Sequence, residues 1–187
     1  MSNAIRHTFV VHVEDEPGAL TRVSSLFRRR GFNIVSLTVG ATDVPGVSRM
    51  TIVVEAADSA ARRIEAHIWK LVNVIRVEDI TRSAAVWREL VLIKVAADAD
   101  ARIHVMKLAD VFRARIVDVA PDSLILETTG TDDKIAGLLE VLRSFGVLEV
   151  ARTGHVAMSR GTATRAPERI YVEPETQTEE SGVSCSV

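Results

Sequence analysis

The sequence predicts an α+β protein made of two tandem βαββαβ units, each with an antiparallel sheet covered by helices on one face. Strand-like alternation and helical spacing follow one another in the same order twice along the 187 residues. Val, Ile and Leu dominate the strand-like segments, and aromatic residues make up only 4% of the chain, so aliphatic side chains must build the cores. We therefore expect two ferredoxin-like domains followed by a polar tail.

The first unit, residues 5–82, is expected to contain six elements. Alternating apolar residues predict strands over residues 7–14, 32–41, 47–56 and 74–81. The first helix should begin at Pro17, which suits the first helical position, and end at Gly31, with Phe32 as the hydrophobic partner of that glycine. Asp58 is expected to cap the second helix.

Side-chain spacing also predicts which residues of this unit share a face. One face of the second strand should carry Val35, Leu37 and Val39. The apolar stripe of the second helix should consist of Ile64, Ile68, Leu71 and Val72. Both patterns are typical of elements that pack against a core.

The second unit, residues 88–161, repeats the order after a linker at residues 83–87. Its strands are expected at residues 90–97, 116–119, 124–127 and 147–151. Its helices should be marked by Ala101, Val105, Leu108 and Phe112, and by Ile135, Leu138, Leu139 and Leu142. The second of these helices should begin near Thr131 and end at Gly146. Residues 162–187 contain two of the five prolines and no leucine, so we expect them to be disordered.

Composition argues against several functional classes. The net charge is −2, from 23 Lys and Arg against 25 Asp and Glu, so no nucleic-acid partner is expected. No apolar run is long enough to span a membrane. The single cysteine, Cys185, cannot form a disulfide framework or a thiolate metal site within one chain, which favours a cytoplasmic location. Because no catalytic motif occurs and no two histidines have zinc-helix spacing, we expect neither a catalytic nor a metal site.

The candidate binding segment joins the first strand to the first helix and reads Asp15-Glu16-Pro17-Gly18-Ala19-Leu20. The amides of its last three residues lack intrahelical acceptors and can point at an anion, while its two acidic residues place carboxylates beside them. This combination suits a free amino acid. On this segment alone, however, a capped helix start is the favoured explanation. The equivalent residues 97–100 of the second unit lack Pro-Gly, so any such site is restricted to the first unit.

Segments of both units resemble one family. The matching segments include Val13-Glu14-Asp15-Glu16-Pro17-Gly18-Ala19-Leu20, Gly31-Phe32-Asn33-Ile34-Val35-Ser36, Arg88-Glu89-Leu90-Val91-Leu92-Ile93-Lys94-Val95 and Ser159-Arg160-Gly161. The first unit resembles an ACT domain, a βαββαβ module that binds small effectors where two such domains pair. Residues 6–161 together resemble the regulatory small subunit of acetolactate synthase, also called acetohydroxyacid synthase.

The resemblance implies a regulatory subunit with no catalytic site and no cofactor of its own. Its partner would be a catalytic large subunit that carries thiamine diphosphate, Mg and FAD and makes acetolactate for branched-chain amino acid biosynthesis. The small subunit would raise that activity and confer feedback inhibition by valine, or by leucine or isoleucine. The alternatives are a free-standing ACT-domain amino-acid sensor acting on another protein and, more remotely, an enzyme on this scaffold.

The resemblance also implies where the effector binds. It would lie between the N-terminal domains of a homodimer, where the loop of one chain faces the start of the second strand of the other. The effector-binding residues carried over in this way are Asp15, Glu16, Pro17, Gly18, Ala19, Leu20, Asn33, Ile34 and Val35. Some family members have asparagine where this chain has Asp15, whose charge is suited to an ammonium group.

Overall fold

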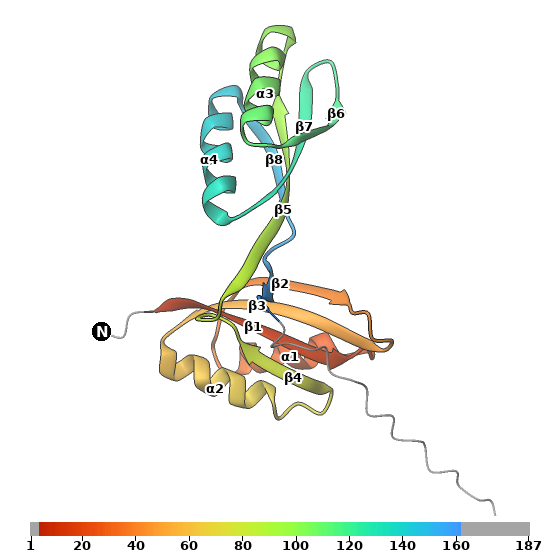
Figure 1. Cartoon of the computed structure of the whole chain (residues 1–187), viewed down its shortest axis with the longest axis vertical. Helices are drawn as coiled ribbons and strands as arrows, with labels where there is room; N and C mark the ends of the chain where they lie inside the picture. The colour runs from red at the N-terminus through yellow and green to blue at the C-terminus, as the bar shows by residue number, and fades with distance from the viewer. Residues whose placement is uncertain (1–3, 162–187) are drawn as a thin grey trace, which may run out of the picture.

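The computed structural model describes residues 4–161, so the expected tail at 162–187 lies outside the described residues. The first part of the chain forms β1 (Ile5–Glu14), α1 (Ala19–Arg29), β2 (Ile34–Ala41), β3 (Val47–Ala56), α2 (Asp58–Ile68) and β4 (Val74–Asp79). The second part forms β5 (Ala85–Ala96), α3 (Ala99–Val111), β6 (Arg115–Val119), β7 (Ser123–Gly130), α4 (Asp132–Leu142), a 3-10 turn (Arg143–Phe145), β8 (Val147–Arg152) and β9 (Val156–Ser159). Figure 1 shows the two parts as separate bodies joined by the long strand β5.

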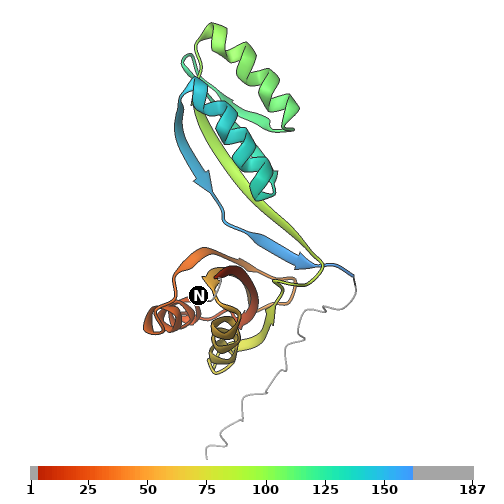
Figure 2. The same cartoon turned by 90° about the vertical axis from the view of Figure 1, so that its left-hand side faces the viewer.

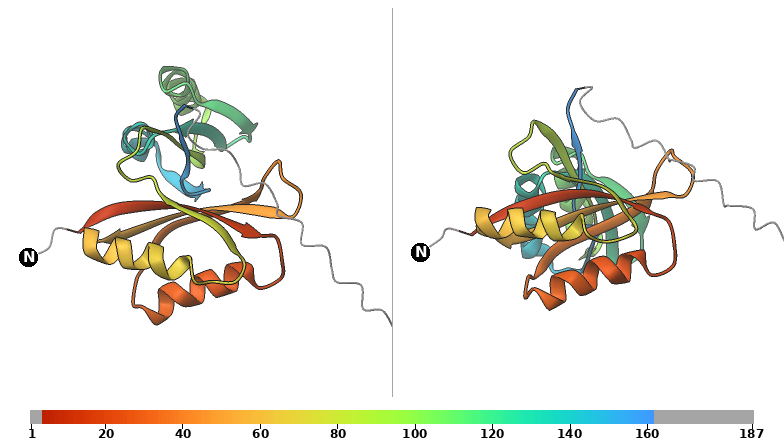
Figure 3. Two further views of the ribbon diagram at one scale, coloured as in Figure 1. Left: turned by 60° about the horizontal axis from the view of Figure 1, so that its bottom comes forward. Right: turned by 90° about the horizontal axis from the view of Figure 1, so that it is seen from below.

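Each part contains an antiparallel sheet with helices on one face, which confirms the predicted fold class. The first sheet has the strand order β2-β3-β1-β4, and α1 and α2 lie against one of its faces (Figure 3, left). The second sheet has the order β6-β7-β5-β8, with α3 and α4 on one face (Figure 2). The first core contains Phe9, Val11, Val13, Val23, Phe27, Met50, Ile52, Val54, Ile64 and Ile68. The second core contains Val91, Ile93, Val95, Val105, Leu124, Leu126, Ile135 and Leu138. No described helix is long and apolar enough to cross a membrane.

Helix α1 ends as predicted but begins later than predicted. At its C-terminus, Gly31 has φ +70°, and the amides of Gly31 and Phe32 donate to the carbonyls of Arg28 and Phe27 at 3.2 and 3.1 Å. This is a Schellman motif, and Phe32 packs on the core beside it. At its N-terminus, Gly18 is the N-cap residue, so Pro17 lies outside the helix and its prediction as the first helical position is wrong.

Three predictions for other elements of the first unit also need correction. Ala57, and not Asp58, is the N-cap residue of α2, because Asp58 already lies in the first turn. Val72 is 90% exposed, since α2 ends at Ile68 and does not carry the stripe that far. In β2, a register shift between Ile34 and Ser36 takes Val35 out of the face that it was expected to share with Leu37.

The expected linker at residues 83–87 is partly a strand. Residues 85–88 open β5 and pair with β9, which the sequence analysis did not predict. This ribbon lies across the face of the first sheet that the helices leave uncovered, as Figures 1 and 2 show. Val10, Ile80 and Ala157 form a small buried cluster under it, with Ala85 and Trp87 packed alongside. The first sheet is therefore buried on both faces along part of its length.

Candidate functional site

The loop between β1 and α1 contains a type II turn. Gly18 has φ +90° and ψ −8°, which is the geometry of the third residue of such a turn, and Pro17 precedes it. The turn is closed by a hydrogen bond of 3.2 Å from the Ala19 amide to the Glu16 carbonyl. The sequence analysis expected the Ala19 amide to be free for a ligand, and in this structure it is not. Among the backbone hydrogen bonds of the described residues, none starts from the amides of Gly18 or Leu20, which stay available.

Polar contacts hold the two acidic residues of the loop in place. The Ser48 hydroxyl donates to Asp15 Oδ1 at 3.1 Å. The Asn73 side-chain amide donates to Oε2 of Glu14 at 3.0 Å and to Oε2 of Glu16 at 3.2 Å. Asn73 is buried, and its backbone carbonyl oxygen accepts a hydrogen bond of 2.9 Å from the Glu14 amide. The loop is thus exposed, and hydrogen bonds from Ser48 and Asn73 hold it in place. It presents carboxylate oxygens and free amides at the surface.

Asn73 and Ser48 were missed as parts of this site. Asn73 lies in the connection between α2 and β4, and Ser48 lies on β3, both far from the loop in sequence. No spacing within the loop points to either of them. Only the sheet register, which sets β3 and β4 beside β1, brings them to Asp15 and Glu16.

The second half of the expected site lies at the opposite end of the sheet. In the register of the sheet, Glu14 pairs with Val47 whereas Ile34 pairs with Val54. Seven residues of β3 therefore separate the two halves, which is about 23 Å at the rise of a strand. Within one chain, the structure brings together Asp15, Glu16, Pro17, Gly18, Ala19 and Leu20 but not Asn33, Ile34 and Val35. Val35 instead lines an open cleft between the two parts of the chain.

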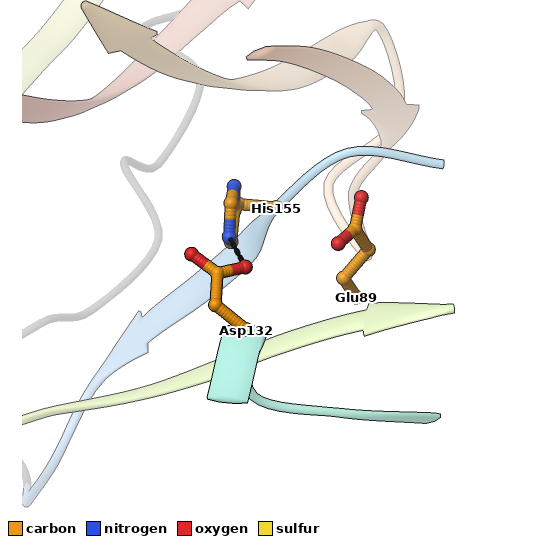
Figure 4. Close-up of side chains that lie close together, drawn as sticks. All are labelled: Glu89, Asp132 and His155. Atoms are coloured by element: carbon orange, nitrogen blue, oxygen red, sulfur yellow. Dashed lines mark hydrogen bonds and ion pairs between the residues drawn. The ribbon is translucent and has the colours of Figure 1, made fainter. Parts of the chain in front are cut away.

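A second polar cluster lies in that cleft. Figure 4 shows Glu89 from β5, Asp132 from the start of α4 and His155 from the segment before β9. His155 Nε2 lies 2.8 Å from Asp132 Oδ1. These three residues include donor atoms close enough for a metal ion. Guanidinium groups already bind both carboxylates, however: Arg152 pairs with Glu89, and Arg6 lies 3.2 Å from Asp132 Oδ2.

The geometry of this cluster suits an ion-pair network rather than a metal centre. The hydrogen bond and charge of Glu89 raise the pKa of Arg152. Arg6 belongs to β1 and Asp132 to α4, so their contact joins the two parts of the chain. Next to it, the Ser36 hydroxyl accepts the His155 amide at 2.9 Å, and Thr38 donates to the His155 carbonyl at 3.1 Å. The cluster therefore fixes the second unit against the outer face of β2.

Comparisons with known proteins identify relatives over both units. A family model described as the small subunit of acetolactate synthase matches residues 88–161, and one described as an AHAS small subunit-like ACT domain matches residues 9–76. The chain is 50% identical over 157 residues to a probable acetolactate synthase small subunit of Archaeoglobus fulgidus, covering 84% of this chain and 98% of that protein. It is 51% identical over 162 residues to the acetolactate synthase small subunit of Mycolicibacterium smegmatis, covering 86% and 95%. The crystal structure of the acetolactate synthase small subunit from Thermotoga maritima superposes with a TM-score of 0.78 at 38% identity, covering 84% of this chain and 99% of that one.

Proposed function

The chain belongs to the acetolactate synthase small-subunit family, and from this premise we propose that it activates its catalytic large subunit and makes it sensitive to valine. As a small subunit of this enzyme, it partners a catalytic large subunit, and the chemistry belongs to that partner. The finer proposal is that a branched-chain amino acid binds at the β1–α1 loop of a homodimer. The single observation that carries it is the exposed type II turn, where free amides lie next to held carboxylates.

The amino acid would use both charges of this loop. The free amides of Gly18 and Leu20 would receive its carboxylate, at the positive end of the α1 dipole. Asp15 would receive the ammonium group through the carboxylate oxygen that Ser48 does not bind. Ion pairing at both ends would select a free amino acid over an amine or a simple acid.

The proposed pocket is completed by a second chain. Strand β2 lies at the edge of its sheet, with Val35 and Val39 each 41% exposed, and an open edge can pair with a copy of itself. An antiparallel pair of β2 strands about a two-fold axis would put Ile34 of one chain beside the partner's Ala41. Ala41 pairs with Ser48, at the end of the sheet where the loop lies. The partner's Asn33, Ile34 and Val35 would then close the pocket, with Ile34 contacting the isopropyl group of valine.

A rate assay of the assembled enzyme tests the proposal. Purified large subunit should form acetolactate faster when this chain is added, and valine should then lower the rate. Gly18→Asp should abolish the inhibition, because its carboxylate would repel that of valine. Gly146→Asp is the matched control, since Gly146 also has φ +90° but lies in the second unit. Activation without any response to valine would contradict the proposed effector site. A large subunit that is not activated would contradict the proposed function as a whole.

A further inference from the structure

A cavity of about 390 Å³ lies on the face of the first sheet opposite α1 and α2. Strands β1, β3 and β4 line its floor, and β9 forms one wall, so both parts of the chain contribute to it. Its lining includes Val10, His12, Ala41, Arg49, Glu78 and Met158. The cavity is separate from the proposed effector site, because it lies on the other face of the sheet and is formed within one chain.

Arg49 places a half-buried cation in this cavity without a carboxylate partner. Its guanidinium donates to the Thr51 hydroxyl at 3.2 Å and to the Ala157 carbonyl, both of which are neutral. Among the described residues, no carboxylate lies within ion-pair distance of Arg49, because Glu78 pairs with Arg76 instead. Burial lowers the pKa of Arg49, although the negative charge of Glu78 opposes the shift. A desolvated guanidinium fork of this kind matches the two oxygens of a carboxylate.

His12 supplies a second polar group whose partner is missing. The residue is only 4% exposed, and its Nδ1 atom is buried with no hydrogen-bond partner among the described residues. Burial, together with the charges of Arg49 and Arg76, lowers the pKa of His12 to about 4, so the ring is neutral at pH 7. A buried polar atom without a partner is costly. Because Nδ1 has almost no accessible surface, a ligand in the cavity would meet the neutral His12 ring and not this atom.

The remaining lining combines apolar Val10 and Met158 with polar Thr42, Asp43 and Ser159. Val10 lies on the floor, Ala41 lies at the end of β2, and Met158 extends from β9 with 63% of its surface exposed. We propose that this cavity binds a small aliphatic carboxylate, either an amino acid or a 2-oxo acid, whose carboxylate pairs with Arg49 beside the neutral ring of His12. The aliphatic part lies against Val10 and Met158. An occupied cavity holds β9 against the first sheet.

Methionine methyl groups provide a direct test in the full chain. Met158 lines the cavity, whereas Met106 is exposed on α3 of the other unit and serves as an internal control. In a sample labelled with ¹³C at the methionine methyls, titration with L-valine or 2-oxoisovalerate should shift the Met158 resonance and leave Met106 unchanged. Isobutylamine, which lacks the carboxylate, should shift neither. A response to both acids, or to one of them, identifies which source of carboxylate the cavity takes.

Variants separate this cavity from the proposed effector loop. Arg49→Gln should weaken the Met158 response about tenfold or more, because it removes charge-assisted hydrogen bonds. Since that change also removes the contact with Ala157, Ser159→Leu provides a second test that fills the cavity from the partly exposed end of β9. Gly18→Asp should leave the Met158 response intact even where it abolishes valine inhibition. An unmoved Met158 resonance, or a response in Arg49→Gln and Ser159→Leu equal to that of the parent, would overturn the proposal.

Discussion

At the scale of single residues, Gly18 and Asn73 fix the shape of the β1–α1 loop. Gly18 holds φ +90°, a conformation that costs L-residues about 1 kcal/mol or more. The side-chain amide of Asn73 donates hydrogen bonds to the carboxylates of both Glu14 and Glu16. The loop therefore presents its amides and carboxylates in one fixed arrangement, which would lower the cost of binding the proposed effector.

The chain offers a matched pair of asparagines to separate stability from binding. Asn73→Ala should lower the free energy of unfolding by about 1–3 kcal/mol, because it leaves buried groups without hydrogen-bond partners. Asn33 is exposed, so Asn33→Ala should leave the stability within about 0.5 kcal/mol of the parent while weakening valine binding. Urea unfolding and calorimetric titration of both variants measure the two effects. Equal destabilisation by the two changes would contradict the assigned roles.

His12 should make the stability of the protein sensitive to acid. Its pKa is about 4 in the folded chain against 6.5 for an ordinary histidine, so the unfolded chain binds the proton more readily between these values. The contribution of His12 is therefore complete above pH 6.5 and is lost as the pH falls towards 4, by up to about 3 kcal/mol. Urea unfolding from pH 7 to 4 should show a smaller loss for His12→Gln than for the parent. The same loss in both proteins would rule out His12 as the source.

At the scale of elements, the sequence predicted the structure best where a few neighbouring residues determine it. Gly31 and Phe32 predicted the Schellman end of α1, and the alternation of Met50, Ile52 and Val54 predicted β3 with its bounds. The start of α1 was placed two residues early, because Pro17-Gly18 suits a type II turn as well as a helix start. In that turn, the Glu16 carbonyl takes the Ala19 amide that the sequence analysis had left for a ligand.

The elements that the sequence did not predict depend on contacts between distant segments. The bulge at Val35 arises in the pairing of β2 with β3, and β9 exists as a strand because residues 85–88 pair with it. Val156 to Ser159 alone gives four residues without a marked alternation of polarity. The ion-pair network of Glu89, Asp132 and His155 could not be predicted from the sequence either. Its residues come from three segments that only the tertiary structure brings together.

Neighbouring residues of β9 test its packing on the first sheet. Ala157 is 1% exposed, on the side of β9 that packs on the first sheet, whereas Val156 next to it is 43% exposed. Ala157→Asp should cost about 3 kcal/mol and detach β9, because it buries a charge without a partner. Val156→Asp should cost less than about 1 kcal/mol. Deuterium uptake by β9 reports detachment, and equal uptake in the two variants would contradict the packing described here.

At the scale of the whole molecule, polar contacts set the position of the second unit. Glu89 is buried and binds both Arg152 and the Gly154 amide, the latter at 3.2 Å. Glu89→Gln should lower stability by about 1–3 kcal/mol, because it removes the nearer of the two carboxylates that face the Arg152 guanidinium. A double-mutant cycle with Arg152→Gln measures their coupling. Additive effects of the two changes would show that the two side chains are not coupled.

The central claim is that one effector site takes the loop of one chain and the start of β2 from another. The test uses two variants that each destroy a different half of the site, Gly18→Asp and Asn33→Asp. Neither homodimer should bind valine. When the two variants are unfolded together and refolded as an equal mixture, half of the dimers should be mixed, and each mixed dimer should have one intact site. Calorimetric titration should then recover about a quarter of the parent's valine sites, as two-fold symmetry requires. A mixture that binds no valine would show that the two halves do not complement each other across a dimer and would contradict the account.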